Sequence, residues 1–177
     1  KGIERSGKYC ISIDEEIFLN SHIWDYMIEN CHLLDNDENL ILAPLLSTGI
    51  PTIDWFVDQF FDDRDRAVLI NEFKNTEFFD IEPNCPGSSI LNKSEKLQRM
   101  LNELILSNID KLLANQDFST RAVNNRPYFC NSVYMIRTDV YSKIVQDKTL
   151  FVDNYDEVPL NKYRDANNYN FLFINNA

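Results

Sequence analysis

Short strand-like segments alternate along this chain with segments of helical spacing, and this alternation constrains the fold more than any other feature. Residues 8–13 alternate apolar and polar side chains and lead into three consecutive acids. Later strand-like runs are rich in apolar, β-branched and aromatic residues, and amphipathic patterns separate them. The alternation favours an α/β layer architecture. We expect strands at 8–13, 40–43 and 128–136, and helices at 22–32, at 95–115 and from Thr138 through Val145.

The helix expected over 95–115 has the clearest periodicity. Its apolar residues recur at spacings of three and four, which places them on one face. Ser94 is expected to cap its amino end, as Ser21 and Thr138 are expected to cap the other two helices. The apolar face consists of Leu97, Leu101, Leu104, Ile105, Ile109, Leu112 and Leu113.

The segment between the second strand and this long helix mixes helical and loop signals. Apolar spacing predicts a helix over 53–60, and the charged run 62–66 predicts a solvated turn. Residues 67–75 are expected to form a short helix. The proline-containing segment 76–94 is typical of a long loop, and long loops within a domain are often functional.

Composition excludes several classes of partner. Apolar residues make up 44% of the 177 residues, enough for one well-buried core, so we expect a single domain. The 28 Asp and Glu residues outnumber the 17 Lys and Arg residues, and the net charge of −11 repels nucleic acid and anionic lipid. No apolar run reaches the roughly 20 residues that span a bilayer, and no signal peptide is evident. We expect a soluble protein of the cytoplasm.

The cysteines and the chain ends carry weaker signals. The four cysteines form no CxxC pair, and neither they nor His22 and His32 have the spacing of metal ligands, so we interpret them as buried thiols and structural histidines. The chain begins at Lys1 without a methionine, and the strand-like apolar run 171–174 stops almost at the last residue. We therefore expect a piece of a longer protein.

The acidic triplet after the first strand is the strongest candidate for chemistry. In extended backbone Asp14 and Glu16 project to one side, with Glu15 opposite, so the two carboxylates can converge on a hard cation such as Mg²⁺ or Mn²⁺. The alternative is a solvated acidic turn at a strand end. The four glycines form no phosphate-binding loop, so a bound phosphate would need a metal or basic side chains. The candidate basic residues are Arg126, Arg137 and Lys162.

Two further features are compatible with a catalytic site. The acidic group Asp153 to Glu157 precedes Pro159, where a loop could hold a carboxylate as general base, although a plain exposed loop fits equally well. Trp55 could stack on a sugar ring, whereas a single tryptophan on an amphipathic helix is more often part of the core.

Three segments resemble GT-A fold glycosyltransferases, the nucleotide-sugar transferases. Residues 6–19, with a polar turn and a hydrophobic strand leading into Asp14-Glu15-Glu16, resemble the stretch that carries the DxD motif. Residues 130–141 are similar to the strand and helix start that the family places after its acceptor region. Residues 153–161 resemble the acidic segment near the base of the inverting enzymes.

The resemblance implies roles for individual residues. Asp14 would contact the ribose or the metal, and Glu16 would coordinate the divalent cation that bridges the diphosphate. Asp156 or Glu157 would deprotonate the acceptor hydroxyl. Substrate binding is assigned to Asp14 together with Glu15, Trp55 and Arg137.

The resemblance also implies a fold and a function. We expect a partial GT-A-like, three-layer domain with a mixed sheet and flanking helices over 1–177, the C-terminal part of a truncated glycosyltransferase whose nucleotide-recognising half would precede it. It would use Mn²⁺ or Mg²⁺ to transfer a sugar from a nucleotide-sugar donor to an unknown acceptor. A non-catalytic α/β interaction or regulatory domain and a metal-dependent phosphotransfer or hydrolase domain are the alternatives.

Overall fold

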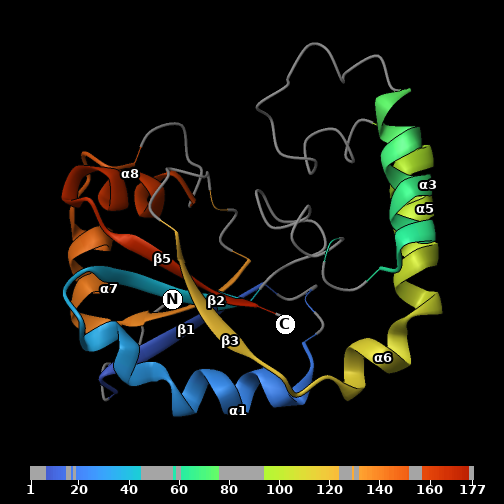
Figure 1. Ribbon diagram of the computed structural model, residues 1–177. Helices are drawn as coiled ribbons and strands as arrows, with labels where there is room; N and C mark the ends of the chain where they lie inside the picture. The colour runs from blue at the N-terminus through green and yellow to red at the C-terminus, as the bar shows by residue number, and fades with distance from the viewer. Residues whose placement is uncertain are drawn as a thin grey trace. The chain divides into compact units, whose positions relative to one another are not determined.

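The computed structural model describes most of the chain, in two compact units (Figure 1). The first unit consists of Lys1–Pro44 and Phe118–Asn175, and the second of Leu45–Asp117 with Asn176–Ala177. The expectation of one domain stays a prediction. The described residues are 7–14, 17, 19–44, 58, 61–75, 94–123, 129, 132–151 and 157–175, with the backbone alone at Phe73, Lys74 and Glu157.

A five-stranded mixed sheet forms the centre of the first unit, which confirms the α/β expectation. The strand order is β1-β4-β2-β5-β3, and β2 and β5 form the parallel pair in an otherwise antiparallel ladder. The expected strands at 8–13 and 40–43 are present, and the third begins later than expected. The strands are β1 (Tyr9–Ile13), β2 (Asn39–Pro44), β3 (Ser119–Val123), β4 (Val133–Arg137) and β5 (Asn170–Asn175).

The strand directions distinguish the two ends of the sheet, at which its strands begin and finish. Because β4 is antiparallel to both β1 and β2, and β2 is parallel to β5, the strands β1, β2 and β5 run the same way. We call the edge where these three strands end the carboxyl edge, with Ile13 and Pro44, and the opposite one the amino edge, with Tyr9 and Asn39. Strand β4 runs in reverse, so its last residue, Arg137, lies at the amino edge.

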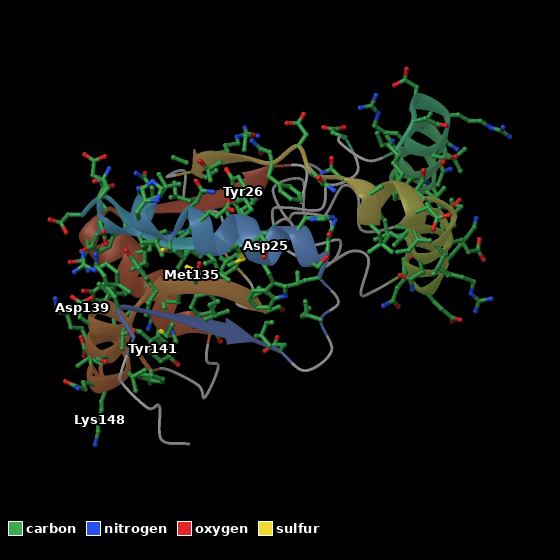
Figure 2. All side chains as sticks on the ribbon, turned by 90° about the horizontal axis from the view of Figure 1, so that it is seen from below. Asp25, Tyr26, Met135, Asp139, Tyr141 and Lys148 are labelled. Atoms are coloured by element: carbon green, nitrogen blue, oxygen red, sulfur yellow. The ribbon has the colours of Figure 1, made fainter. Side chains whose placement is uncertain are left out.

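Helices cover both faces of this sheet. Tyr26 of α1 packs its ring 5.5 Å from Phe118 and has a side-chain hydrogen bond with Thr120 of β3, so α1 lies on one face. Tyr26, labelled in Figure 2, comes from α1, whereas Arg164 of α8 lies over the ring of Phe171 in β5. Thr120 pairs with Ile174, and Phe171 is three residues from Ile174, so the Phe171 side chain lies on the other face, which α8 covers. The result is a three-layer unit. Its helical elements are α1 (Ser21–Glu29), the 3₁₀ helix η1 (Cys31–Asp35), α7 (Thr138–Gln146) and α8 (Glu157–Asn167).

Phe129 anchors the core beneath α8. Its ring packs against Phe171 and Phe173 of β5, with ring centroids 5.4 and 5.7 Å away. The backbone N–H of Phe129 donates to Asn161 Oδ1 at 2.9 Å, and Asn161 Nδ2 donates to the Phe129 carbonyl at 2.8 Å. The buried guanidinium of Arg164 lies 4.5 Å from the centre of the Phe171 ring. Helix α8 is thus attached to the sheet by aromatic packing and by paired hydrogen bonds.

The second unit contains a pair of packed helices. Lys96 Nζ lies 2.7 Å from Glu72 Oε2 across the pair, and the helix that begins at Glu95 has the expected Ser94 cap. The long helix expected over 95–115 is divided at Asn108, whose side chain donates to the Leu104 carbonyl and so competes with helical bonding. The helices are α3 (Asp63–Lys74), α5 (Glu95–Ser107) and α6 (Ile109–Ala114), and the core consists of Phe61, Leu69, Leu97 and Leu101.

Three local predictions at helix starts are wrong. The 62–66 run is the start of α3 rather than a turn, because Asp62 Oδ1 accepts the backbone N–H of Asp65. Asn20, not Ser21, caps α1 by accepting from His22 N. At α7 the cap position is held by Arg137 instead of Thr138, with no side-chain cap bond. The helix expected over 53–60 lies outside the described residues, except for Asp58. Residues 76–93 of the loop expected over 76–94 also lie outside them.

Within the described parts of the chain, no helix is long and apolar enough to cross a bilayer. This finding agrees with the hydropathy of the sequence.

Replacing Asn161 by Ala should lower the free energy of unfolding by about 2–4 kcal/mol, because it leaves the N–H and C=O of buried Phe129 without their side-chain partner. Urea unfolding followed by circular dichroism measures the change. The control is Asn167→Ala on the exposed end of the same helix, with an expected loss below about 0.5 kcal/mol. Equal losses in the two variants would show that the Asn161 bonds do not hold α8.

Candidate functional site

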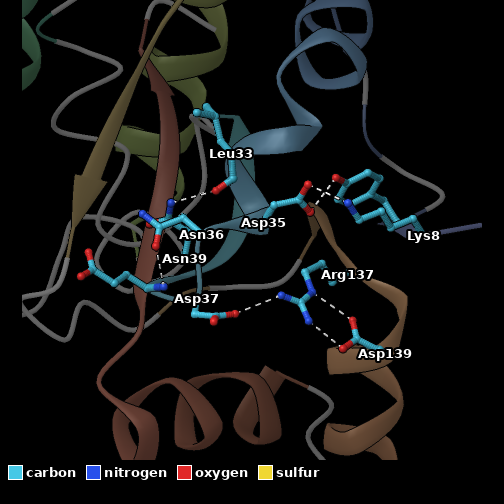
Figure 3. Close-up of polar contacts among 10 residues, drawn as sticks. Lys8, Leu33, Asp35, Asn36, Asp37, Asn39, Arg137 and Asp139 are labelled. Carbon is cyan, nitrogen blue, oxygen red and sulfur yellow. Dashed lines mark hydrogen bonds and ion pairs between the residues drawn. The ribbon is translucent and has the colours of Figure 1, made fainter.

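An open, polar depression of about 880 Å³ lies at the amino edge of the sheet. It is formed where β1 begins, where η1 ends and where β4 passes into α7. Charged and hydroxyl side chains dominate its lining, as Figure 3 shows for its ion pairs. The lining residues are Gly7, Lys8, Asp35, Arg137, Thr138, Asp139, Ser142, Lys143 and Gln146.

Asp35 accepts two hydrogen bonds from the start of β1. Lys8 Nζ donates to its Oδ2 at 2.6 Å, and the Tyr9 hydroxyl donates to its Oδ1 at 2.8 Å. The bond from Lys8, with that from Tyr9, holds the pKa of the Asp35 carboxyl below its usual value, and the same bond raises the pKa of Lys8. Asp35 therefore stays ionised and joins η1 to β1.

A tight turn between η1 and β2 sets the position of this carboxylate and of Asp37. The Asn36 side chain accepts the backbone N–H of Glu38 at 3.1 Å, an arrangement typical of Asx turns. Asn39 Nδ2 donates to the Leu33 carbonyl at 2.9 Å and ties the turn back to the 3₁₀ helix (Figure 3). Asp35 and Asp37 consequently lie on the two sides of a fixed turn.

Arg137 ends β4 and faces two carboxylates. Its Nε and Nη2 donate to the two oxygens of Asp139 at 3.0 and 2.7 Å, a bidentate pair, and its Nη1 lies 3.3 Å from Asp37 Oδ1. The Asp139 bond raises the pKa of Arg137, and Arg137 lowers the pKa of Asp139. Asp139 also lies in the first turn of α7, where the helix dipole favours a negative charge.

Two cations of this depression, Lys8 and Arg137, already have carboxylate partners. Lys8 is bound to Asp35, and Arg137 is bound to Asp139 and Asp37. Exposed pairs of this kind contribute about 0–1 kcal/mol each. We interpret the cluster mainly as a structural connection of β1, η1, β4 and α7. The substrate-binding role assigned to Arg137 stays a prediction.

Asp14 lies at the opposite, carboxyl edge. Its backbone N–H donates to the Ser132 carbonyl at 2.8 Å, which extends the β1–β4 ladder by one residue, and its side chain is exposed. The Ile17 N–H donates to the Asp14 carbonyl at 3.3 Å. The acid is therefore held at the strand end where the sequence predicts it.

The structure does not bring Asp14 and Arg137 together. Tyr9 pairs with Arg137, and Asp14 lies opposite Ser132, so the two predicted residues lie at opposite ends of β4, about 17 Å apart along the strand. The predicted convergence of Asp14 with the other motif acids falls on positions that the structure does not describe. Of the predicted site residues, Glu15, Glu16, Trp55 and Asp156 lie outside the described residues, as does basic Arg126.

The acidic segment before Pro159 is partly helical rather than wholly a loop. Helix α8 begins at Glu157, and Pro159 lies in its first turn, where proline is tolerated because the N–H groups there have no helical acceptor. The sequence interpretation used Pro159 as a loop signal and missed this helix. Nothing is described of the Glu157 side chain, so its role as a base stays a prediction. Lys162 is exposed on the same helix.

The described residues contain no clear metal site, and among them Cys10 is not a reactive thiol. No group of three or more His, Cys, Asp and Glu side chains suited to a metal gathers there, and the acids that follow Asp14 are not among them. Cys10 and Cys31 are free and half-buried, whereas we expected buried thiols. Burial raises the pKa of Cys10, which makes this thiol a poor nucleophile. Cys85 and Cys130 lie outside the described residues.

No family model matches the chain, and neither a curated protein nor a solved structure matches it significantly. The assignment of function therefore depends on the geometry of the two sheet edges.

The amino-edge cluster was not predicted as a unit. Among its members only Arg137 was singled out, because the partners Lys8, Asp35 and Asp139 come from distant segments. A weak local signal exists in Asp35-Asn36-Asp37, a composition typical of turns. It predicts the turn but not its arginine partner, which is 100 residues from Asp37.

We expect Asp139→Asn to lower stability at neutral pH and to have little effect in acid. Because Arg137 lowers the folded-state pKa of Asp139, the carboxylate stabilises the fold above its usual pKa of about 3.9. That contribution is lost as the pH falls through the lowered folded-state value. Thermal unfolding between pH 2 and 7 measures the difference in melting temperature between the parent and Asp139→Asn. This difference should narrow below about pH 4.

Asp37→Asn is the matched control, because the Asp37 side chain is 94% exposed and makes a single longer contact with Arg137. It should leave the acid branch of the stability curve close to that of the parent. A difference in melting temperature between the parent and Asp139→Asn that stays constant with pH would contradict the ionic role of Asp139.

Proposed function

We propose that this chain is part of a GT-A-like, sugar-nucleotide-dependent glycosyltransferase of the cytoplasm, with its donor site at the carboxyl edge of the sheet around Asp14. The donor is a nucleotide sugar, the cofactor is Mn²⁺ or Mg²⁺, and the acceptor is unidentified. The three-layer unit with its mixed sheet is compatible with such a domain.

The observation that carries the proposal is the position of Asp14. It follows β1 directly, at the edge where β2 and β5 also end. In open α/β sheets ligands bind outside the carboxyl ends of the strands, because loops and helix starts gather there. The bond from its N–H to Ser132 fixes the backbone of Asp14 and leaves the carboxylate exposed to a ligand.

The proposed metal ligands suit a hard divalent cation. Carboxylate oxygens are the ligands that Mg²⁺ and Mn²⁺ prefer, and Asp14 and Glu16 would supply them. A bound cation would stabilise the negative charge that develops on the departing diphosphate. With a net charge of −11 and no glycine-rich phosphate loop in the sequence, such a cation would help the chain to attract a diphosphate.

The remaining roles belong to side chains of the chain itself. Asp14 would hold the donor's ribose or its metal, and Asp156 or Glu157 would take the proton from the acceptor hydroxyl as it attacks the sugar. Trp55 would stack on the sugar ring, and Glu15 and Arg137 would complete substrate binding. For Arg137 this role requires a substrate long enough to reach the amino edge and the release of Arg137 from its pair with Asp139.

Asp14→Ala should abolish Mn²⁺-dependent binding of UDP or GDP, or weaken it at least about 10-fold, the lower range for lost metal-site interactions. Isothermal titration calorimetry, with and without Mn²⁺, measures the binding to this chain and to the longest polypeptide that its gene encodes. Asp37→Ala removes an exposed carboxylate at the other edge and should leave binding unchanged.

Three results would contradict the proposal. They are the absence of metal-dependent nucleotide binding in the parent, an Asp14→Ala variant that binds like the parent, and equal losses in the two variants. Hydrolysis of simple phosphate esters without sugar transfer would instead favour the metal-dependent hydrolase alternative.

A further inference from the structure

The outer side of β1 presents backbone hydrogen-bonding groups that no other strand of the described residues uses. β1 is the first strand of the sheet, and no strand of the described residues pairs with its other side. The Thr138 N–H donates to the Lys8 carbonyl, and the Asp14 N–H donates to Ser132. Since hydrogen bonding alternates along an antiparallel strand, the even-numbered residues of β1 face β4. The N–H and C=O groups of Tyr9, Ile11 and Ile13 therefore point outward.

The same residues expose apolar side chains. Ile11 and Ile13 are 39% and 46% exposed, and they lie on one face because residues two apart in a strand share a face. Natural edge strands are usually protected by a charge, a proline or a bulge, and β1 contains none of these. The opposite edge strand, β3, carries exposed Arg121 at its centre. The two outermost strands of the sheet thus differ, and β1 is the one suited to pairing with a further strand.

We propose that β1 pairs with the β1 strand of a second copy of this chain, antiparallel and across a two-fold axis at Ile11. In this register Ile11 lies opposite its own counterpart, and Tyr9 lies opposite Ile13 of the other copy. Lys8 of each copy lies opposite Asp14 of the other, so both ends of the pair match positive with negative charge. An antiparallel strand pair is self-complementary and closes after two copies, as an isologous dimer requires.

The charge match is compatible with the existing contacts of Lys8. An ammonium group has three donors, and the bond to Asp35 uses one of them, while the side chain is 63% exposed. Five residues per copy bury much less than the roughly 800 Å² per partner of a stable complex. The dimer is therefore weak, reversible and dependent on concentration, and it extends two five-stranded sheets into one.

Sedimentation velocity over a concentration series tests the proposal, with Ile11→Lys and Ile28→Lys as a matched pair. Ile28 is also exposed, at 59%, but it lies on α1 away from the edge. The parent and Ile28→Lys should show a concentration-dependent dimer, and Ile11→Lys should be monomeric because it places a charge on the two-fold axis. Circular dichroism verifies that both variants are folded.

A cysteine pair tests the register independently. Residues 11 of the two copies form a hydrogen-bonded antiparallel pair in the proposed dimer, with Cα atoms about 5.5 Å apart, which is within the range of a disulfide. Under mild oxidation Ile11→Cys should give more disulfide-linked dimer than Ile28→Cys, which controls for the native thiols.

The proposal does not depend on the glycosyltransferase assignment, and neither substitution site is part of the proposed donor site. A parent that stays monomeric at every concentration would overturn it, as would a dimer that persists in Ile11→Lys. Equal crosslinking of the two cysteine variants would overturn the register. If the parent stays monomeric and β1 binds an extended apolar peptide, then self-pairing is wrong and β1 pairs with a strand of another protein.

Discussion

Burial of both faces of β2 is the constraint on which the first unit depends. Strand β2 lies between β4 and β5, and nearly all residues of these three strands are buried. Apolar side chains that alternate between two faces need cover on both, which α1 supplies on one side and α8 on the other. The one charged residue within these three strands is Arg137, which lies at the end of β4, where it reaches water. Both candidate sites of this unit lie at such ends for this reason.

The two edges use their charges differently. At the amino edge the cations Lys8 and Arg137 are held by carboxylates. At the carboxyl edge the fixed backbone of Asp14 presents an exposed acid. A site that must attract a ligand needs unsatisfied charge, and this contrast favours the carboxyl edge as the place of chemistry. The amino edge acts mainly through the stability of the α7 and η1 connections.

Strand β1 links the proposed chemistry to the proposed self-pairing. Asp14 follows its last residue and would serve as a metal ligand in one proposal and as the partner of Lys8 from the second copy in the other. One carboxylate has several acceptor positions, so both contacts are compatible, but a bound cation would weaken its attraction for Lys8. Metal binding and dimerisation are therefore expected to oppose each other modestly, whereas the Ile11 substitutions separate the two properties.

The sequence by itself determined the local features of this protein. Period-two alternation predicted β1, heptad-like spacing with Ser94 predicted α5, and the strand end predicted the place of Asp14. These features depend on neighbours within a few residues. Tertiary structure alone decided the strand order, the pairing of Arg137 with Asp37 and the attachment of Phe129 to Asn161. Such contacts join residues far apart in sequence, and their free energy comes from burial and hydrogen bonding that arise only when the sheet has assembled.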